Sequence, residues 1–276
     1  MKRGAARAAE KPRTLDRPSD TGGNVYLYGI VRWPVPGGLT ALRTAAGVGD
    51  PPSSVRVIRS GDLAALVSDV SAAEMSAQGV RGMRRDMKAH SSVLNALAAK
   101  VTVLPARFGV VLPDEGALIA EFLDPRRRAL EEFLEQLDGT VEVTLRAIYI
   151  EEQVLRDLVS ARPELAAGRG ARRGRSASMA TESRIELGRQ IAAAIKDLQD
   201  QDARWLLDLL NPVIRDARIG KPLTDLMVLN ASFLVGRAML PKFDRTLEIA
   251  TRETRDRMTF DCVGPLPPFS FVDLRL

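Results

Sequence analysis

The stretch Asp225–Val235, DLMVLNASFLV, does most to decide the fold, because it is the clearest buried strand in the sequence. A short and nearly continuous apolar run of this kind is typical of a strand covered on both faces. Moving outward, Val141–Ile150 alternates between apolar and polar residues, which predicts a second strand. Two more strands are expected, one near Val213–Ala217 and one at Met258–Val263.

Helices separate these strands. They are predicted at Glu151–Ala167, with an interruption at Pro163, from about Met179 to Asp200, and at Lys242–Arg255. The apolar stripe of the long helix consists of Ile185, Gly188, Ile191, Ala192, Ile195 and Leu198. The resulting order is β-α-β-β-α-β with an inserted helical arm, which is the order of the ferredoxin-like motif.

The first half of the chain also mixes strands and helices. Strands are predicted at Asn24–Val31, Val55–Arg59 and Leu63–Val70, and helices at Arg84–Lys100 and Ala117–Leu137, the last with a kink or split at Pro125. The predicted fold class is therefore α+β with two domains. An N-terminal α+β domain is expected at 24–138, a ferredoxin-like (βαββαβ) C-terminal domain at 139–263, and a docking tail at 264–276.

The positive charge is concentrated in two segments. The chain of 276 residues has a net charge of +5, of which residues 1–23 carry +3 and residues 168–175 (GRGARRGR) carry +4. Both segments lack the apolar residues that ordering requires, so we expect a disordered basic tail at 1–23 and a flexible link at 168–175. The remainder is close to neutral, whereas nucleic-acid binders usually carry a basic patch on a folded face. An anionic protein partner and nucleic acid both stay open as alternatives.

No set of residues in the sequence is typical of an enzyme. His90 is the only histidine and Cys262 the only cysteine, so neither a disulfide nor a metal site rich in thiolate or imidazole ligands is expected. His90 is expected to be a capping or surface residue, and Cys262 to be buried as a small hydrophobic residue. No cofactor, membrane span or secretory signal is predicted, which favours the cytoplasm.

Two local features stand out instead. Leu104–Gly109 (LPARFG) combines Pro105, which fixes φ, with Gly109, which permits an unusual backbone angle. The rigid guanidinium of Arg107 between them either forms a structural ion pair or contacts a partner. Gly264–Val272 (GPLPPFSFV) favours an extended backbone and carries large apolar side chains, so it should dock, either on its own chain or on a partner. We interpret it as a clasp that closes the fold.

These motifs, taken in order, resemble the gas vesicle protein F/L family (GvpF/GvpL). The resemblance rests on five segments. The first three are VYLYGIV at Val25–Val31 with Tyr28 and Gly29, then His90 with Val93 and Leu94, and then VLPARFGVV at Val103–Val111 with Pro105, Arg107, Phe108 and Gly109. The last two are LNASFLV at Leu229–Val235 with Asn230, and GPLPPFSFV at Gly264–Val272 with Pro265, Pro268, Phe269 and Phe271. Each segment is weak evidence by itself, but the common order is specific.

The resemblance implies an α+β N-terminal domain, a ferredoxin-like C-terminal domain and a non-catalytic role in gas vesicle assembly. Its implied partners are the small hydrophobic shell protein and other accessory proteins, with neither nucleic acid nor a membrane involved. We hypothesise that the binding surface is an exposed sheet or the helical arm around residues 152–198. The alternative, a nucleic-acid-binding ferredoxin-like protein, predicts aromatic side chains on the central strands.

Overall fold

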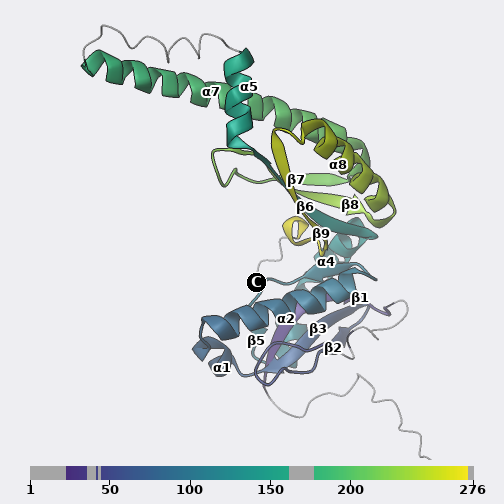
Figure 1. Ribbon diagram of the computed structural model, residues 1–276. Helices are drawn as coiled ribbons and strands as arrows, with labels where there is room; N and C mark the ends of the chain where they lie inside the picture. The colour runs from purple at the N-terminus through teal and green to yellow at the C-terminus, as the bar shows by residue number, and fades with distance from the viewer. Residues whose placement is uncertain (1–22, 36–41, 43–44, 162–176, 273–276) are drawn as a thin grey trace, which may run out of the picture. The chain divides into compact units, whose positions relative to one another are not determined.

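The computed structural model describes residues 23–35, 42, 45–161 and 177–272. The basic segments 1–23 and 168–175 therefore lie outside the described residues, except for Gly23. The chain divides into two compact units, and the boundary along the sequence lies between Gln136 and Leu137. Each unit contains an antiparallel sheet with helices (Figure 1), which confirms the predicted α+β class.

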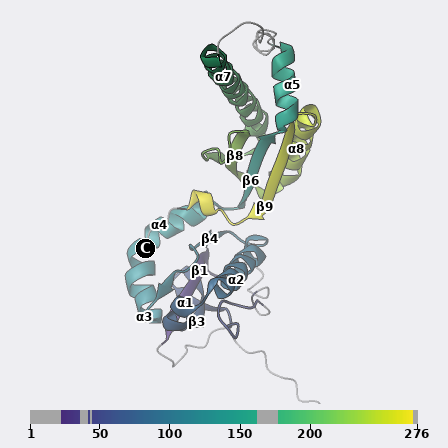
Figure 2. The same cartoon turned by 60° about the vertical axis from the view of Figure 1, so that its left-hand side comes forward.

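The first unit is built on a sheet with the strand order β2-β3-β1-β4, and a short β5 also pairs with β1. The strands are β1 (Asn24–Arg32), β2 (Arg56–Ser60), β3 (Leu63–Val70), β4 (Val103–Pro105) and β5 (Val111–Leu112). The helices are α1 (Ala72–Ala77), α2 (Val80–Ala98), α3 (Glu115–Ala117), a π-helical turn (Leu118–Leu123) and α4 (Asp124–Gln136). Every residue of β1 from Val25 to Val31 is buried, because α2 and α4 cover the sheet from opposite sides (Figure 2).

The change of direction expected at Pro125 takes the form of the π-helical turn that precedes it. The proline itself lies in the first turn of α4. The helical run is continuous from 115 to 136, so Pro125 has no N–H to donate to the carbonyl of Glu121, four residues earlier, and that carbonyl instead accepts from Nη1 of Arg126 at 2.8 Å. The hairpin predicted around Gly61 is confirmed, with Arg56 opposite Val67 and Ser60 opposite Leu63.

The second unit contains β6 (Thr140–Tyr149), α5 (Glu151–Ala161), α7 (Ala177–Leu210), β7 (Asp216–Ile219), β8 (Met227–Gly236), α8 (Leu240–Thr254) and β9 (Met258–Leu266). Single 3₁₀ turns lie at Asn211–Val213, Arg237–Met239 and Phe269–Phe271. The strand order is β7-β8-β6-β9, and every neighbouring pair is antiparallel. This arrangement is consistent with the ferredoxin-like prediction.

Three predicted boundaries in this unit are wrong. The long helix α7 does not end near Asp200 but continues through Trp205 to Leu210, because its buried side chains continue to Leu206 and Leu210. The strand expected from Val213 begins only at Asp216, since Val213 belongs to the 3₁₀ turn Asn211–Val213. The last strand extends to Leu266, so the first residues of the predicted tail belong to the sheet.

The two faces of the second sheet differ in chemistry. Side chains alternate along a strand, so one face of β6 and β8 packs into the core with α7 and α8. The core residues from these two strands include Val143, Leu145, Ala147, Tyr149, Leu229, Ala231, Phe233 and Val235. The intervening residues Glu142, Thr144, Arg146, Asn230 and Ser232 are placed on the opposite, polar face.

Candidate functional site

His90 lies at the centre of a buried polar cluster in the first unit. Its side chain on α2 is 3% exposed, so the expectation of a capping or surface residue is wrong. Nδ1 of His90 shares a hydrogen bond of 2.8 Å with the hydroxyl of Tyr26, and the imidazole stacks on the ring of Tyr28. Phe108 contacts the imidazole edge-on. His90 thus lies on the buried, otherwise mostly apolar face of α2.

The chemistry of this cluster favours a structural role. Burial lowers the pKa of His90 to about 4, against a smaller opposing effect of the Ala106 carbonyl group. Burial also raises the pKa of Tyr26 and of Tyr28. The imidazole is therefore neutral and both hydroxyls keep their protons near pH 7. Within the described residues, no group of three or more His, Cys, Asp or Glu side chains is placed to hold a metal ion.

The motif LPARFG runs from β4 towards β5 beside this cluster. Pro105 is opposite Gly29 in the β1–β4 ladder, and the N–H of Ala106 donates to the carbonyl of Tyr28 at 2.8 Å. Gly109, at a φ of +90°, donates its N–H to the Tyr26 hydroxyl at 3.2 Å. The structure thus brings together Tyr28, Gly29, His90, Pro105, Phe108 and Gly109, whereas the side chain of Arg107 is exposed.

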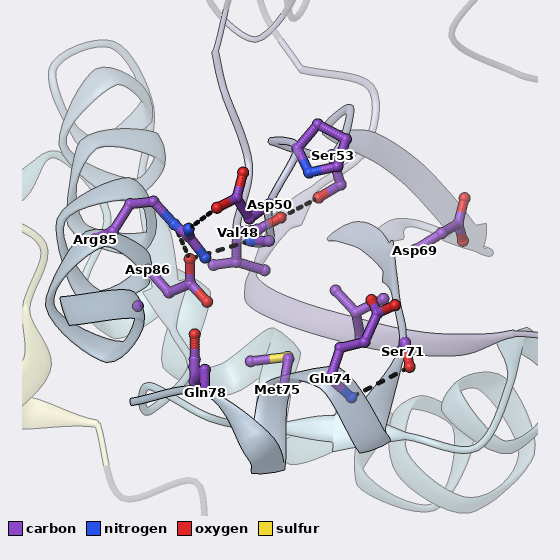
Figure 3. A pocket seen from close by; sticks show the side chains of 14 residues that line it. Val48, Asp50, Ser53, Asp69, Ser71, Glu74, Met75, Gln78, Arg85 and Asp86 are labelled. Carbon is purple, nitrogen blue, oxygen red and sulfur yellow. Dashed lines mark hydrogen bonds and ion pairs between the residues drawn. The ribbon is translucent and has the colours of Figure 1, made fainter. Parts of the chain in front are cut away.

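A cavity of about 620 Å³ opens on the other side of Tyr28, between the 47–53 loop and helices α1 and α2 (Figure 3). The Tyr28 hydroxyl accepts a hydrogen bond from the N–H of Val48 at 2.9 Å and lies 3.0 Å from Oγ of Ser68. Asp86 of α2 accepts from the N–H of Gly49 at 3.1 Å. These two side chains therefore fix the loop that forms one wall of the cavity.

Gly47 lets this loop pack directly on the tyrosine. A Cβ atom at this position would lie 2.5 Å from Oγ of Ser68, 2.6 Å from the Tyr28 hydroxyl and 2.7 Å from the carbonyl of Ser53. No larger residue fits without movement of the loop. The wall of the cavity depends on this close approach.

Sequence reasoning missed Asp86, although a signal was present. Asp86, His90, Val93 and Leu97 follow helical spacing on α2, and all four are buried. A carboxylate that continues an apolar stripe predicts a buried charge that needs partners. Met87, the next residue along α2, is 48% exposed although it is apolar.

The remaining motif residues gather in the second unit. The backbone N–H and Oγ of Ser270 donate to the buried carboxylate of Glu142 at 2.8 and 2.6 Å, and the guanidinium of Arg218 lies over the ring of Phe271. Residues 269–271 therefore lie on the polar face of the sheet of their own unit. Gly264 permits the approach, since a Cβ there would be 3.0 Å from the carbonyl of Glu142. The motif residues placed here are Gly264, Pro265, Pro268, Phe269 and Phe271.

Asn230 has a separate position, beside the β7–β8 loop. Its Nδ2 donates to the carbonyl of Lys221 at 2.9 Å, and its own carbonyl accepts from the N–H of Gly220 at 2.7 Å. Asn230 therefore fastens the start of the loop that continues through Pro222 and Leu223.

This loop and α7 enclose a groove of about 910 Å³ in the second unit. Gly188, Ile191, Ala192 and Ile195 of α7 form one wall, and Leu223 and Leu226 contribute to the other. The apolar stripe predicted for the long helix thus lines an open groove along part of its length. Leu223 is 66% exposed and Ile185, one turn before Gly188, is 52% exposed. We call the groove lined by Gly188, Ile191, Ala192, Ile195, Leu223 and Leu226 the α7 groove.

Comparison with known proteins places the chain in a family. The model of the family described as "Gas vesicle synthesis protein GvpL/GvpF" matches residues 24–273, which is nearly the whole chain. The chain belongs to the GvpL/GvpF family. It therefore has an accessory role in gas vesicles.

Two relatives from one organism share different fractions of their residues with this chain. The chain is 36% identical to gas vesicle protein F of Streptomyces sp. (strain CB03234), over 91% of this chain and 100% of that protein. It is 28% identical to gas vesicle protein L of the same strain, over 90% and 92%. The crystal structure of GvpF from Anabaena sp. PCC7120 has a TM-score of 0.77 at 23% identity, covering 92% of this chain and 100% of that chain. That likeness supports the fold.

Two further predictions can be compared with the structure of this GvpL/GvpF protein. Cys262 is exposed on β9, so its expected burial is wrong; its strand is at the edge of the sheet. Among the described helices, none combines the length and the apolar character that crossing a bilayer requires.

Proposed function

We propose that this GvpL/GvpF protein is a non-catalytic assembly factor that binds the hydrophobic gas vesicle shell protein, and that the α7 groove is the binding surface. It would act in the cytoplasm, at the nascent or growing vesicle wall, together with other accessory proteins. The observation that carries the proposal is the apolar part of the groove, where Ile191 and Ile195 of α7 line it together with the exposed Leu223. The charged residues Glu151, Lys196 and Asp225 also line the groove, and the exposed Ile185 lies on α7 just before it.

The energetics favour an apolar partner at this surface. Burying a leucine or isoleucine side chain fully is worth about 1.5–3 kcal/mol, so Leu223 and Ile185, which are 66% and 52% exposed, together offer about 2–3.5 kcal/mol to an apolar helix or strand that covers them. Exposed apolar surface next to a groove is typical of a protein interaction site. A very apolar shell subunit needs such cover until it joins the wall, and no chemistry is required for that task.

The open face of the second sheet is less suited to the shell protein. It carries the ion pairs Arg146–Asp261, at 3.3 Å, and Arg218–Asp216, at 2.9 Å. Residues 269–271 of the same unit also lie on it. A polar face that is partly covered by its own chain offers little to an apolar partner, so of the two surfaces hypothesised from the sequence we favour the helical arm.

The nucleic-acid alternative loses its main support at the central strands. Readers of single-stranded RNA of this architecture stack bases on aromatic side chains of the sheet. The aromatic residues of β6 and β8 are Tyr149 and Phe233, and both belong to the buried core shared with the helices. Neither is available on the open face for stacking.

The identities to relatives favour an F-type role over an L-type role. The chain shares 36% of its residues with protein F and 28% with protein L of the same Streptomyces strain, at similar coverage. We therefore expect it to act at the step served by protein F in an organism that has both.

Co-expression with the shell protein tests the proposal. Leu223→Asp places a charge in the groove at a position that is 66% exposed, so the fold should tolerate it. Val80→Asp is the matched control, because Val80 is 67% exposed but lies on α2 of the first unit. We expect Leu223→Asp to reduce the co-purified shell protein about tenfold and Val80→Asp to leave it unchanged. Equal recovery with both variants, or equal loss, would contradict the assignment of the groove.

A further inference from the structure

Asp86 has one carboxylate oxygen whose partners the described part of the chain does not supply. The side chain is 1% exposed and lines the cavity of the first unit. Oδ1 accepts from the N–H of Gly49 and from Nε of Arg85, each at 3.1 Å. Oδ2 has no hydrogen-bond partner among the described residues. In Figure 3 it is turned away from Arg85, towards the part of the cavity lined by Gln78 and Met75.

A carboxylate oxygen in this position is costly unless something donates to it. Leaving a buried acceptor unsatisfied costs about 1–3 kcal/mol, and more for a charged group. Although Oδ1 is paired with Arg85, a buried oxygen such as Oδ2 that lacks a donor calls for a specific explanation, such as a bound molecule. Oδ2 of Asp86 faces the cavity, so a donor there would have to come from a molecule inside it.

The charges around the cavity define what that molecule must carry. The lining includes four carboxylates and a single guanidinium, that of Arg85. Arg85 already contacts Asp50 at 2.6 Å as well as Asp86. Arg56 pairs with Asp69 at 2.6 Å from outside the lining. The cavity remains negative after these pairings, with Glu74 at its mouth and Asp86 at its base.

We propose that this cavity binds a ligand with a primary ammonium or guanidinium group on an alkyl chain. The source is either a free alkylamine or the lysine or arginine side chain of a protein partner. The cationic head donates to Oδ2 of Asp86 and to the amide oxygen of Gln78. The stem lies along Val70 and Met75, which are both partly exposed, as long basic side chains cover apolar surface while their heads make polar contacts.

This site is independent of the shell protein and of the α7 groove. All of its residues belong to the first unit, whereas the α7 groove belongs to the second. Loss of shell-protein binding through Leu223→Asp would leave the cavity unaffected. Failure of either proposal is therefore visible without the other.

The amide signal of Gly49 in ¹H–¹⁵N spectra of the full chain is the natural reporter, because this N–H donates to Asp86. The probes are agmatine, the capped peptide Ac-Ala-Arg-Ala-NH₂, and the same peptide with uncharged citrulline for arginine. We expect saturable shifts with the charged probes and none with citrulline. Tighter binding of agmatine points to a free amine, and tighter binding of the peptide to a partner side chain. Absence of saturation with both charged probes, or equal shifts with citrulline, overturns the proposal.

Three variants locate the binding. Asp86→Asn should raise the Kd about tenfold or more, because it removes a charged acceptor. Glu74→Gln, exposed at the mouth, should raise it by a smaller factor and does not threaten the fold. Glu132→Gln is the matched control, since this carboxylate is exposed on α4 and pairs with Arg128. If Glu74→Gln and Glu132→Gln weaken binding equally, the attraction is unspecific and the cavity is not the site.

Discussion

The hydrogen bonds between Ser270 and Glu142 should contribute to the free energy of unfolding of the second unit. Glu142 is 3% exposed on β6, and its carboxylate accepts from the backbone N–H of Ser270 at 2.8 Å and from its Oγ at 2.6 Å. Oγ also lies 3.0 Å from Oγ of Ser232. Ser270→Ala removes both side-chain contacts and keeps the backbone contact. The buried carboxylate then loses half of its hydrogen bonds from the tail.

The cost follows from the kind of bond that is lost. A hydrogen bond to a charged group contributes about 1.5–3 kcal/mol, so we expect Ser270→Ala to lower the free energy of unfolding by about 2 kcal/mol. With a urea dependence of about 1–3 kcal/mol/M, the unfolding midpoint moves down by about 1 M. Ser160→Ala is the matched control, because Ser160 is exposed on α5 and its Oγ donates to the backbone carbonyl of Arg156. Its effect should stay within about 0.5 kcal/mol.

Urea unfolding followed by tryptophan fluorescence measures this difference. The chain has two tryptophans, Trp33 in the first unit and Trp205 in the second. In a Trp33→Phe background the signal reports on the second unit alone. A change below about 0.5 kcal/mol in Ser270→Ala, or one equal to that in Ser160→Ala, would refute the idea that the tail is bound through this contact.

Removal of Phe269–Leu276 separates a clasp from a partner site. The cut leaves β9 complete, since that strand ends at Leu266. A clasp predicts a second unit that unfolds at lower urea, because the cut removes the contacts to Glu142 and the stacking of Phe271 under Arg218. An unchanged midpoint combined with loss of shell-protein binding would show that the tail is the partner site instead.

Two further predictions concern the first unit. Gly47→Ala should destabilise it by about 1–3 kcal/mol, because the new Cβ would collide with Ser68 and Tyr28, and Trp33 fluorescence in urea measures the loss; an unchanged midpoint would contradict the close approach. His90 has a folded-state pKa of about 4, below its ordinary 6.5, so the unfolded chain binds the extra proton between these values. Relative to His90→Gln, which does not titrate, the protein should lose about 3 kcal/mol of stability as the pH falls from about 6.5 to 4 and no more below that. Parallel pH profiles of the two proteins would contradict the buried neutral imidazole.

The elements that the sequence predicted best are those with one clear period. β6 alternates along Thr140–Tyr149, β8 is apolar except for Asn230 and Ser232, and α8 is amphipathic, so the local pattern is sufficient to predict them. The end of α7 was missed for a physical reason. Its residues near Leu206 are buried in the core of the second unit through contacts with residues that are distant in sequence. The local sequence up to Asp200 therefore does not indicate that the helix continues.

The polar residues were harder to place than the apolar ones. His90 and Cys262 were assigned from the usual preferences of their types, and the structure reverses both, with His90 buried and Cys262 exposed. The buried His90 shares a hydrogen bond with the hydroxyl of Tyr26, which in turn accepts from the N–H of Gly109. Tyr26 is far from His90 in sequence, so this partner is in place only once the sheet has formed. Exposure of Cys262 depends on its strand being at the edge of the sheet, which a local pattern does not reveal.

Two of the motif residues, Tyr28 and Asn230, support the walls of the acidic cavity and the α7 groove without being part of either lining. Tyr28 holds the N–H of Val48 and with it the wall of the acidic cavity. Asn230 holds the carbonyl of Lys221 and with it the loop that borders the α7 groove. Substituting either side chain should therefore weaken binding by releasing a loop, without removing any atom that touches a partner. Variants of Tyr28 or Asn230 that lose a partner consequently say nothing about contact, whereas Glu74→Gln and Leu223→Asp change the surfaces themselves.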